Sequence, residues 1–238
     1  MSDISFISFD DSDYSEVASK ISKKYSIPIA SPKKDGTYLF ISKDSYISFQ
    51  NRKLFNSFTK GSFSTRIKNF QRENILKKAI SFDANKPKKI LDSTGGLGHD
   101  AFILALLGQK ITVIEKNKGL CALFEVSLED LPSTEYFNKA KKNIDIVNSD
   151  SKKFRKRLKD YDLVYVDPMF KHRGKAGRSG ALTLMSQYLD DFSDVSNIFL
   201  ESEFNKIVVK RQKLFKSISS ITPNSVINGK SIDFHIFS

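Results

Sequence analysis

The feature that most constrains the fold of this chain is an alternation of strand-like and helix-like segments that begins at Lys88. The strand-like segments are KKILDS, KITVIE, NIDIVNSD, DLVYVD and NKIVVK, at residues 88–93, 110–115, 143–150, 162–167 and 205–210. Helix-like segments at residues 99–107, 117–130 and 151–158 separate the first four. Alternation at this spacing predicts a parallel sheet with helices on both faces, a doubly wound α/β fold.

The C-terminal residues follow a different pattern. The segment KSISSITPNSVINGKSIDFHIF, residues 216–237, predicts a strand, a turn at Asn228-Gly229 and a second strand. A Rossmann-like doubly wound sheet that ends in an antiparallel hairpin is typical of class I S-adenosylmethionine-dependent methyltransferases. We therefore expect a domain of this class over residues 61–238.

Residues 1–60 are expected to form a small N-terminal α+β subdomain. Ser15–Tyr25 has helical spacing, and the segments TYLFIS and SYISFQ alternate apolar and polar residues around Lys43-Asp44, which indicates a β-hairpin. The residues that follow, 66–80, predict a single amphipathic helix with a cationic face. Its apolar residues are Ile67, Phe70, Ile75 and Ile80.

The charge of the chain indicates the class of its partner. It has 39 Lys and Arg against 27 Asp and Glu, a net charge of +12, which favours a polyanion such as nucleic acid. A basic surface that serves only solubility is the alternative. Nine basic residues against two Asp lie in residues 139–159, and eight against one Glu in residues 52–78. Such patches bind phosphates, and Lys153 and Arg157 are predicted substrate contacts.

Other functional classes are disfavoured by composition. A single cysteine excludes an internal disulfide and a cysteine-based metal cluster, and three scattered histidines make a zinc site improbable, so no metal is expected. The start of the chain lacks a signal-peptide pattern, and the longest apolar run, Ala101–Leu107, is too short to span a bilayer. We expect a soluble cytoplasmic protein without a membrane partner. The sequence does not indicate an oligomeric state.

The turn after the first strand, DSTGGLGHDA at residues 92–101, lies where a doubly wound sheet binds its cofactor. Gly96 and Gly98 allow the backbone to approach a ligand and to turn sharply into the next helix. Glu115 ends the second strand, where a carboxylate can accept both ribose hydroxyls of a nucleoside cofactor. Gly96-x-Gly98-x-x-Ala101 also fits the dinucleotide fingerprint, so a nicotinamide cofactor competes with S-adenosylmethionine.

Two details favour S-adenosylmethionine. Asp92 stands four residues before Gly96, which is the methyltransferase spacing. Asp100 enters the helix N-terminus, where it would oppose a pyrophosphate but suits a cationic sulfonium and amine; it can also be a first-turn helix stabiliser. Asp150 and Ser151, after the third strand, are expected at the adenine edge, and a plain helix cap is nearly as good an interpretation.

The sequence Asp167-Pro168-Met169-Phe170 follows the fourth strand, where methyltransferases that act on exocyclic or amide nitrogens carry a related motif. Asp167 and the Pro168 carbonyl can accept hydrogen bonds from an NH2 group, and Phe170 can stack on a base. The alternative is an Asp-Pro turn with a core Phe. The basic loop 171–180 is expected to bind substrate phosphates, or else to be simply solvated. Its predicted contacts are Lys171, His172, Arg173 and Lys175.

The segments DSTGGLGHDAF, ITVIEKN, VYVDPMFKHR, IVVKR and TPNSVINGKSIDFHIF together resemble, in this order, the RsmJ family. The resemblance covers roughly residues 66–238. It implies S-adenosylmethionine-dependent methylation of a guanine N2 in small-subunit (16S) ribosomal RNA, as free RNA or in the 30S particle. The family usually has Arg where this chain has His99 and Lys116. The implied cofactor contacts are His99, Asp100, Glu115, Lys116, Asp150, Ser151 and Asp167.

Two other functions stay open at this point. One is a catalytically silent RNA-binding or ribosome-assembly module that keeps a methyltransferase fold. The other is an NAD-dependent oxidoreductase, disfavoured because no acid or base for hydride transfer is evident. The residues alone indicate a base-amine methyltransferase acting on nucleic acid. RNA, guanine and the ribosome come only from the resemblance.

Overall fold

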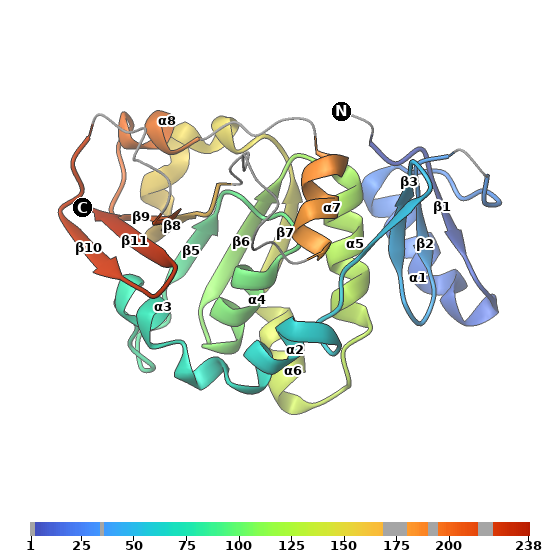
Figure 1. Cartoon of the computed structure of the whole chain (residues 1–238), viewed down its shortest axis with the longest axis horizontal. Helices are drawn as coiled ribbons and strands as arrows, with labels where there is room; N and C mark the ends of the chain where they lie inside the picture. The colour runs from blue at the N-terminus through green and yellow to red at the C-terminus, as the bar shows by residue number, and fades with distance from the viewer. Residues whose placement is uncertain (1–2, 34–35, 169–179, 190–194, 214–220) are drawn as a thin grey trace. The chain divides into compact units, whose positions relative to one another are not determined.

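Figure 1 shows a computed structural model of the chain, which describes residues 3–33, 36–168, 180–189, 195–213 and 221–238. The chain forms two compact units. The N-terminal unit contains the residues up to Ser64, Asn117–Pro132 and the helix α7 (Gly180–Tyr188). The sheet unit contains Thr65–Lys116, Ser133–Pro168 and the described residues from Val195 onward.

The N-terminal unit is built on a four-stranded sheet of order β1-β2-β3-β4. The predicted hairpin is confirmed as β2 (Tyr38–Ile41) and β3 (Tyr46–Phe49), which pair antiparallel. The sequence did not predict β1 (Phe6–Phe9), parallel to β2, or β4 (Arg52–Phe55), antiparallel to β3. The unit's helices are η1 (Ser12–Tyr14), α1 (Ser15–Tyr25), as predicted, α5 (Lys118–Glu129) and α7.

The sheet unit contains a seven-stranded sheet of order β10-β11-β9-β8-β5-β6-β7. Five strands are parallel, β11 runs antiparallel to its neighbour β9, and β10 runs antiparallel to β11, which confirms the predicted sheet and its C-terminal hairpin. The strands are β5 (Lys89–Asp92), β6 (Lys110–Glu115), β7 (Ile144–Asn148), β8 (Leu163–Val166), β9 (Ile207–Gln212), β10 (Ser225–Asn228) and β11 (Ile232–Phe237).

Helices cover both faces of this sheet. On one face α4 (His99–Leu106) packs on β6, β7 and α6 (Glu135–Lys142), and Figure 1 shows α4 across the strands. On the other face η3 (Ser151–Asp160) and α8 (Ser196–Leu200) close a core with the strands. That core includes Leu91, Leu158, Val164, Val166, Phe199 and Val209, all buried. The apolar segments therefore form strands because both of their faces are covered.

The alternation of side chains along the strands decides which residues face α4. Asp92 pairs with Tyr165, and Tyr165 pairs with Val208. Residues two apart on a strand share a face. Since Val164, Val166 and Val209 face η3 and α8, Tyr165 and Lys210 face α4, together with Asp92 and the residue after β8, Asp167.

Two predicted helices differ from the structure. Residues 66–80 do not form one helix: α2 (Gly61–Lys68), η2 (Phe70–Arg72) and α3 (Asn74–Ala79) are separated at Asn69 and Glu73, which leave the helical backbone. Ile75, predicted on the apolar face, is 37% exposed because the break changes the helical phase. The basic helix after β7 is η3, a 3-10 helix of ten residues that ends at Asp160.

Candidate active site

Two acidic residues stand at the point where the strand order reverses. The chain runs outward through β5, β6 and β7 and then returns to place β8 beside β5. Asp92 is the last residue of β5, and Asp167 directly follows β8. In a doubly wound sheet, ligands bind outside the carboxyl ends of the strands at this point. The two residues that the sequence predicted for cofactor and base are thus brought together.

The loop from β5 to α4 is held against β6. Gly95 donates its N–H to the Ile114 carbonyl at 3.0 Å, and a Cβ at this residue would lie 2.5 Å from the side chain of Val113. Gly96 and Gly98 have φ of 53° and 74°, the left-handed region that favours glycine. The predicted turn therefore depends on glycine at these two positions.

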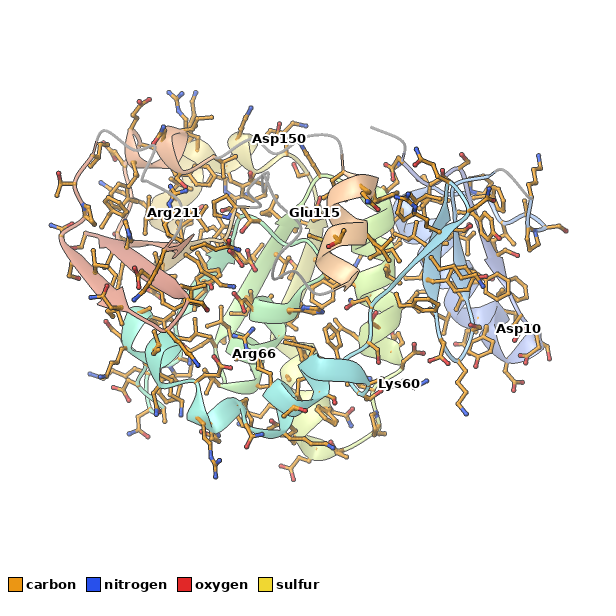
Figure 2. The ribbon with its side chains drawn as sticks, viewed as in Figure 1. Asp10, Lys60, Arg66, Glu115, Asp150 and Arg211 are labelled. Atoms are coloured by element: carbon orange, nitrogen blue, oxygen red, sulfur yellow. The ribbon has the colours of Figure 1, made fainter. Side chains whose placement is uncertain are left out.

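The carboxyl edge of the sheet carries the other predicted cofactor residues, among which Glu115 and Asp150 are labelled in Figure 2. Glu115 Oε2 accepts the Gly96 N–H at 2.9 Å. The Asn148 amide donates to the carbonyls of Glu115 and Lys116, each at 3.0 Å, so β6 and β7 are joined at this edge. Asp150 caps η3 by accepting the Lys152 N–H at 2.9 Å. The helix-cap interpretation of Asp150 is thereby satisfied, and its contact with a cofactor stays a prediction.

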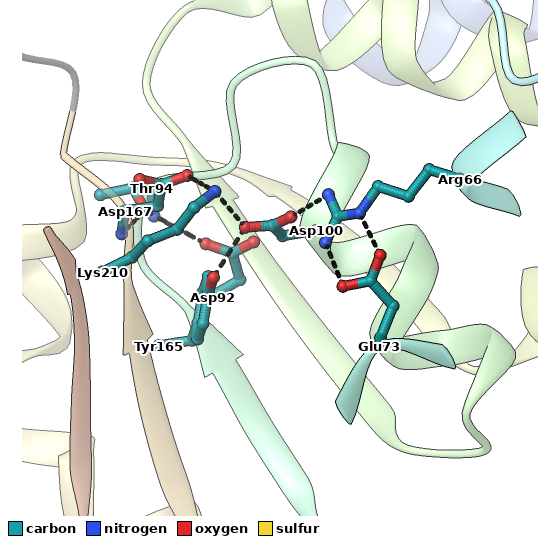
Figure 3. A network of polar contacts seen from close by, with 8 residues as sticks. All are labelled: Arg66, Glu73, Asp92, Thr94, Asp100, Tyr165, Asp167 and Lys210. Carbon is teal, nitrogen blue, oxygen red and sulfur yellow. Dashed lines mark hydrogen bonds and ion pairs between the residues drawn. The ribbon is translucent and has the colours of Figure 1, made fainter. Parts of the chain in front are cut away.

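Asp100 is the centre of a polar network that Figure 3 shows. Its side chain is 8% exposed. Oδ1 accepts from Arg66 Nη1 at 2.5 Å, and Oδ2 accepts from the Tyr165 hydroxyl at 2.6 Å and from Lys210 Nζ at 2.7 Å. Burial alone would raise the pKa of Asp100, but Lys210 and Arg66 hold it well below its ordinary value. Asp100 is therefore an ionised anchor.

Arg66 extends this network to the helical segment before β5. Its Nε and Nη2 donate to the two carboxylate oxygens of Glu73 at 2.6 and 3.1 Å. A guanidinium that binds one carboxylate with two nitrogens and a second with its third is held in a fixed orientation. Glu73 and Arg66 thus fix the position of Asp100 from outside the sheet.

Lys210 joins Asp100 to Asp167. Its Nζ lies 2.7 Å from Oδ2 of each carboxylate, and its side chain is 19% exposed. Burial would lower the pKa of Lys210, but the two carboxylates raise it above its ordinary value, so the ammonium stays charged. Asp167 is the open end of the network, with 38% of its side chain exposed.

Thr94 connects Asp167 to Asp92. Its Oγ1 accepts the Asp167 backbone N–H at 2.7 Å and donates to Asp92 Oδ1 at 3.3 Å, while its own N–H donates to the same oxygen at 3.0 Å. Asp92 is 3% exposed. Burial, reinforced by the charges of Asp100 and Asp167, raises the pKa of Asp92 to about 7.

The remaining predicted residues fall into four groups. His99 begins α4, and burial lowers its pKa to about 4, so its imidazole is neutral at pH 7. Pro168 and Ser151 are buried, and Lys153 and Arg157 are exposed on η3. The predicted base and substrate contacts that lie outside the described residues are Phe170, Lys171, His172, Arg173 and Lys175.

The sequence interpretation missed Lys210, Arg66 and Thr94 as site residues. A signal for Lys210 existed, because a charged residue ends an apolar strand in NKIVVK. Nothing in the sequence indicated that Arg66 reaches Asp100, since 34 residues separate them. Thr94 lies inside the glycine loop, but no sequence pattern marked it as a site residue.

The charged residues of this site fit a cationic cofactor better than a phosphate. Asp92, Asp100 and Asp167 form an acidic cluster with Lys210 and Arg66 as its cations. The Gly96 N–H, which a pyrophosphate would need, is donated to Glu115. A sulfonium and an amine suit such a site, and two phosphate charges do not. In the described part of the chain, no group of three or more His, Cys, Asp or Glu is arranged to hold a metal, and no helix could cross a membrane.

Comparisons with known proteins show a methyltransferase family. Residues 26–238 match the family described as "Putative SAM-dependent methyltransferase". Ribosomal RNA small subunit methyltransferase J of Francisella tularensis subsp. novicida is 30% identical over 213 residues, 86% of this chain and 88% of the relative. The protein of the same description from Coxiella burnetii is 26% identical over 233 residues, 92% and 91% of the two chains.

One solved structure shows the fold. A SAM-dependent methyltransferase from Neisseria gonorrhoeae superposes with a TM-score of 0.71 at 19% identity, covering 97% of this chain and 94% of the other. The predicted fold class, a Rossmann-like methyltransferase sheet with a C-terminal antiparallel hairpin and an additional N-terminal sheet, is confirmed.

Proposed function

Since the chain belongs to the S-adenosylmethionine-dependent methyltransferase family that includes ribosomal RNA small subunit methyltransferase J, the RsmJ family, we propose that it methylates the exocyclic N2 amine of a guanine in small-subunit ribosomal RNA. The observation that supports the proposal most is the position of Asp167 beside Asp92, at the carboxyl ends of adjacent parallel strands. A ribosomal substrate implies action in the cytoplasm.

The residues proposed to hold the cofactor surround the β5–α4 loop. S-adenosylmethionine, when bound, supplies a methyl group activated by a sulfonium. Gly96 and Gly98 let the backbone approach it, and Asp92 provides a buried carboxyl group at the start of the loop. Glu115 and Asp150 lie at the ends of neighbouring strands, where a ribose and an adenine would be recognised. Lys116, Ser151 and His99 are the further contacts implied by the family resemblance.

Asp167 and Pro168 are proposed to bind the target amine. An aromatic amine is a poor nucleophile because its lone pair is delocalised into the ring. The Asp167 carboxylate and the Pro168 carbonyl would accept hydrogen bonds from the two N–H groups of the amine. These hydrogen bonds would direct the lone pair toward the methyl group and stabilise the developing positive charge. The nitrogen–carbon bond would form as the carbon–sulfur bond of the sulfonium breaks and the sulfur leaves as a neutral thioether. The methylated amine would then give up one proton, and Asp167 is the proposed acceptor. Phe170 is proposed to stack on the base.

The experiment that tests the proposal measures methyl transfer from labelled S-adenosylmethionine to small-subunit rRNA and to 30S particles, followed by nucleoside analysis. We expect N2-methylguanosine, and the better of the two substrates tells free RNA from the assembled particle. Asp167→Ala should lower the rate by about 100-fold or more while RNA affinity changes little. Asp145→Ala, which removes an exposed carboxylate from β7, is the matched control and should keep the rate.

Other results would contradict the proposal in distinct ways. A different methylated nucleoside would refute guanine N2. Cofactor binding without methylation of either substrate would favour another nucleic acid target or a silent RNA-binding module. Full activity in Asp167→Ala would refute the assigned role of Asp167. Binding of a nicotinamide cofactor in competition with S-adenosylmethionine would favour the oxidoreductase.

A further inference from the structure

One lysine in the site has no counterpart in the sequence prediction and no direct role in the proposed reaction. The side chain of Lys210 projects from β9 on the face covered by α4. Its Nζ bridges one oxygen of Asp100 and one oxygen of Asp167, both at 2.7 Å. The three charges come from three elements: β9, the first turn of α4 and the end of β8. Lys210 is thus the only residue, in the described part of the chain, whose side chain joins those two carboxylates.

The two carboxylates differ in how firmly they are held. Asp100 is 8% exposed and also accepts from Tyr165 and Arg66, and Arg66 is itself fixed by Glu73. Asp167 is 38% exposed. In this arrangement Asp100 is the anchor, Lys210 is the link, and Asp167 is the end that remains accessible.

A purely structural ion pair does not account well for this geometry. Burying a lysine costs desolvation free energy, and an apolar residue at the same strand position often stabilises a fold equally well. Neighbouring positions of β9 are in fact the buried Val208 and Val209. A buried charge that ends on an accessible carboxylate is more typical of a functional site.

We propose that Lys210 is a positioning residue for Asp167: by bridging to Asp100, it fixes the orientation of the Asp167 carboxylate for the target amine. This inference rests on the proposed function. Lys210 takes Oδ2, and Thr94 fixes the backbone N–H of the same residue at 2.7 Å. The second carboxylate oxygen, Oδ1, is the one assigned to the amine.

Burial raises the pKa of Asp167 above its ordinary value, and Lys210 opposes this shift, so the effect of removing Lys210 follows from the charges that face Asp167. They are Lys210 from β9, Asp100 from α4, Asp92 from β5 and Arg66 from α2, with the Tyr165 hydroxyl from β8. Without Lys210, two carboxylates face Asp167, and Arg66, already paired with Asp100 and Glu73, is the remaining cation. Asp167 would then hold its proton to higher pH and would lose its fixed orientation.

The kinetic experiment compares Lys210→Met, Lys210→Arg and the control Lys110→Met, which alters an exposed lysine at the start of β6. In Lys210→Met we expect kcat to fall about 100-fold, with the KM for RNA within about threefold, because the lost interaction acts in the transition state. The acidic limb of the kcat–pH profile should move up by about one pH unit or more. In Lys210→Arg we expect kcat to be at least about tenfold higher than in Lys210→Met. The acidic limb of its kcat–pH profile should stay at the wild-type pH.

If Lys210→Met does not fold, Asp100→Asn tests the same link by removing the anchor. It should move the acidic limb in the opposite direction, to lower pH, because the charge of Asp100 raises the pKa of Asp167 and Lys210 would then pair with Asp167 alone. A purely structural role predicts a lower melting temperature with an unchanged pH profile in the folded fraction. That outcome, or a kcat within about threefold of wild type in Lys210→Met, would overturn the inference.

A second readout does not depend on the substrate. The carboxyl carbon of Asp167 can be followed by NMR during a pH titration of the whole chain, with Asp167→Asn to assign its signal. We expect its midpoint to lie about one pH unit or more higher in Lys210→Met than in wild type. An unchanged midpoint refutes the inference whatever the substrate is. Absence of rRNA methylation by the wild type would refute only the proposed function.

Discussion

At the scale of single residues, the most unusual group of the site is the carboxyl of Asp92. It ends β5, is 3% exposed, and accepts two hydrogen bonds from Thr94. These hydrogen bonds favour the ionised form, but burial and the charges of Asp100 and Asp167 outweigh them and raise its pKa to about 7. Near neutral pH the cofactor-free protein therefore contains both the protonated and the ionised form of Asp92.

This pKa predicts how Asp92→Asn changes stability with pH. Because the folded pKa lies above the unfolded one, the stability that Asp92 contributes is fully present below about pH 4 and is lost as pH rises through about 7. Asn keeps the oxygen acceptor but does not ionise. The free energy of unfolding of Asp92→Asn relative to wild type should thus be higher at pH 8 than at pH 5, by about 2 kcal/mol.

Urea denaturation at both pH values measures this difference. Asp145→Asn is the control, because it removes a carboxylate from the exposed surface of β7. An equal change in the free energy of unfolding at pH 5 and pH 8 would show that Asp92 is ionised in the folded state across this range.

The site residues that could be predicted from the sequence are those fixed by local geometry. Asp92 and Asp167 end strands, and parallel strands bring their carboxyl ends to one edge, so their neighbourhood follows from the fold class. The partners of Lys210 and Arg66 could not be predicted, because they depend on which strands are adjacent and on where a preceding helix lies. The interpretation of Asp100 was incomplete for the same reason: its three partners come from three distant segments.

At the scale of elements, η3 is the clearest candidate for phosphate contacts. Leu158 is buried and Phe154 is half-buried, while Lys152, Lys153, Arg155, Lys156 and Arg157 are exposed. In a 3-10 helix every third residue lies on one row with a separation of about 6 Å along the axis. Lys153, Lys156 and Lys159 therefore form one row of cations, and Lys152 and Arg155 lie on the next row.

Neutralising this element should weaken RNA binding in a salt-dependent way. The variant with Lys153→Gln, Arg155→Gln and Lys156→Gln removes three positive charges without touching Asp92 or Asp167. If all three bind phosphates, the slope of log affinity against log salt should become shallower by about 2 to 3. Filter binding of rRNA at a series of salt concentrations measures the slope.

The matched control changes three lysines of α1, with Lys20→Gln, Lys23→Gln and Lys24→Gln. Lys20 and Lys24 form ion pairs with Glu129 and Glu125, so their charges are already partly compensated. The control removes the same total charge from the chain. An equal loss of slope in both variants would show that net charge, and not η3, governs the affinity.

The elements themselves were predicted well where one pattern dominates. The five parallel strands and the final hairpin follow from apolar runs and from the Asn228-Gly229 turn. The prediction of one helix over residues 66–80 was wrong, because the spacing of its apolar residues does not reveal the breaks at Asn69 and Glu73. The side chain of Glu73 is bound to Arg66. The strand β1 was missed because its partner β2 lies far along the chain. The strand β4 was missed because its turn from β3, at Gln50 and Asn51, contains no glycine and only one of its four residues is buried.

At the scale of the whole molecule, the predicted site and the N-terminal sheet belong to different compact units. The described cofactor and catalytic residues, from Asp92 to Pro168, all belong to the sheet unit, and strands β1 to β4 belong to the N-terminal unit. A ligand stabilises the structure that binds it by RT ln(1 + [L]/Kd), about 2.7 kcal/mol at a hundredfold excess over Kd. Binding of S-adenosylmethionine should therefore protect the sheet unit more than the N-terminal unit.

Hydrogen exchange with mass spectrometry, with and without S-adenosylmethionine, measures this protection segment by segment. Amides of β5, β6 and β8 should exchange about 100-fold more slowly with saturating cofactor, because their exchange requires opening of the site. Amides of β1 to β4 should change less, since opening of that sheet leaves Asp92 and Glu115 in place. NAD at the same concentration is the control and should protect neither sheet. Equal protection of both sheets by S-adenosylmethionine would show instead that the two units open as a single cooperative structure.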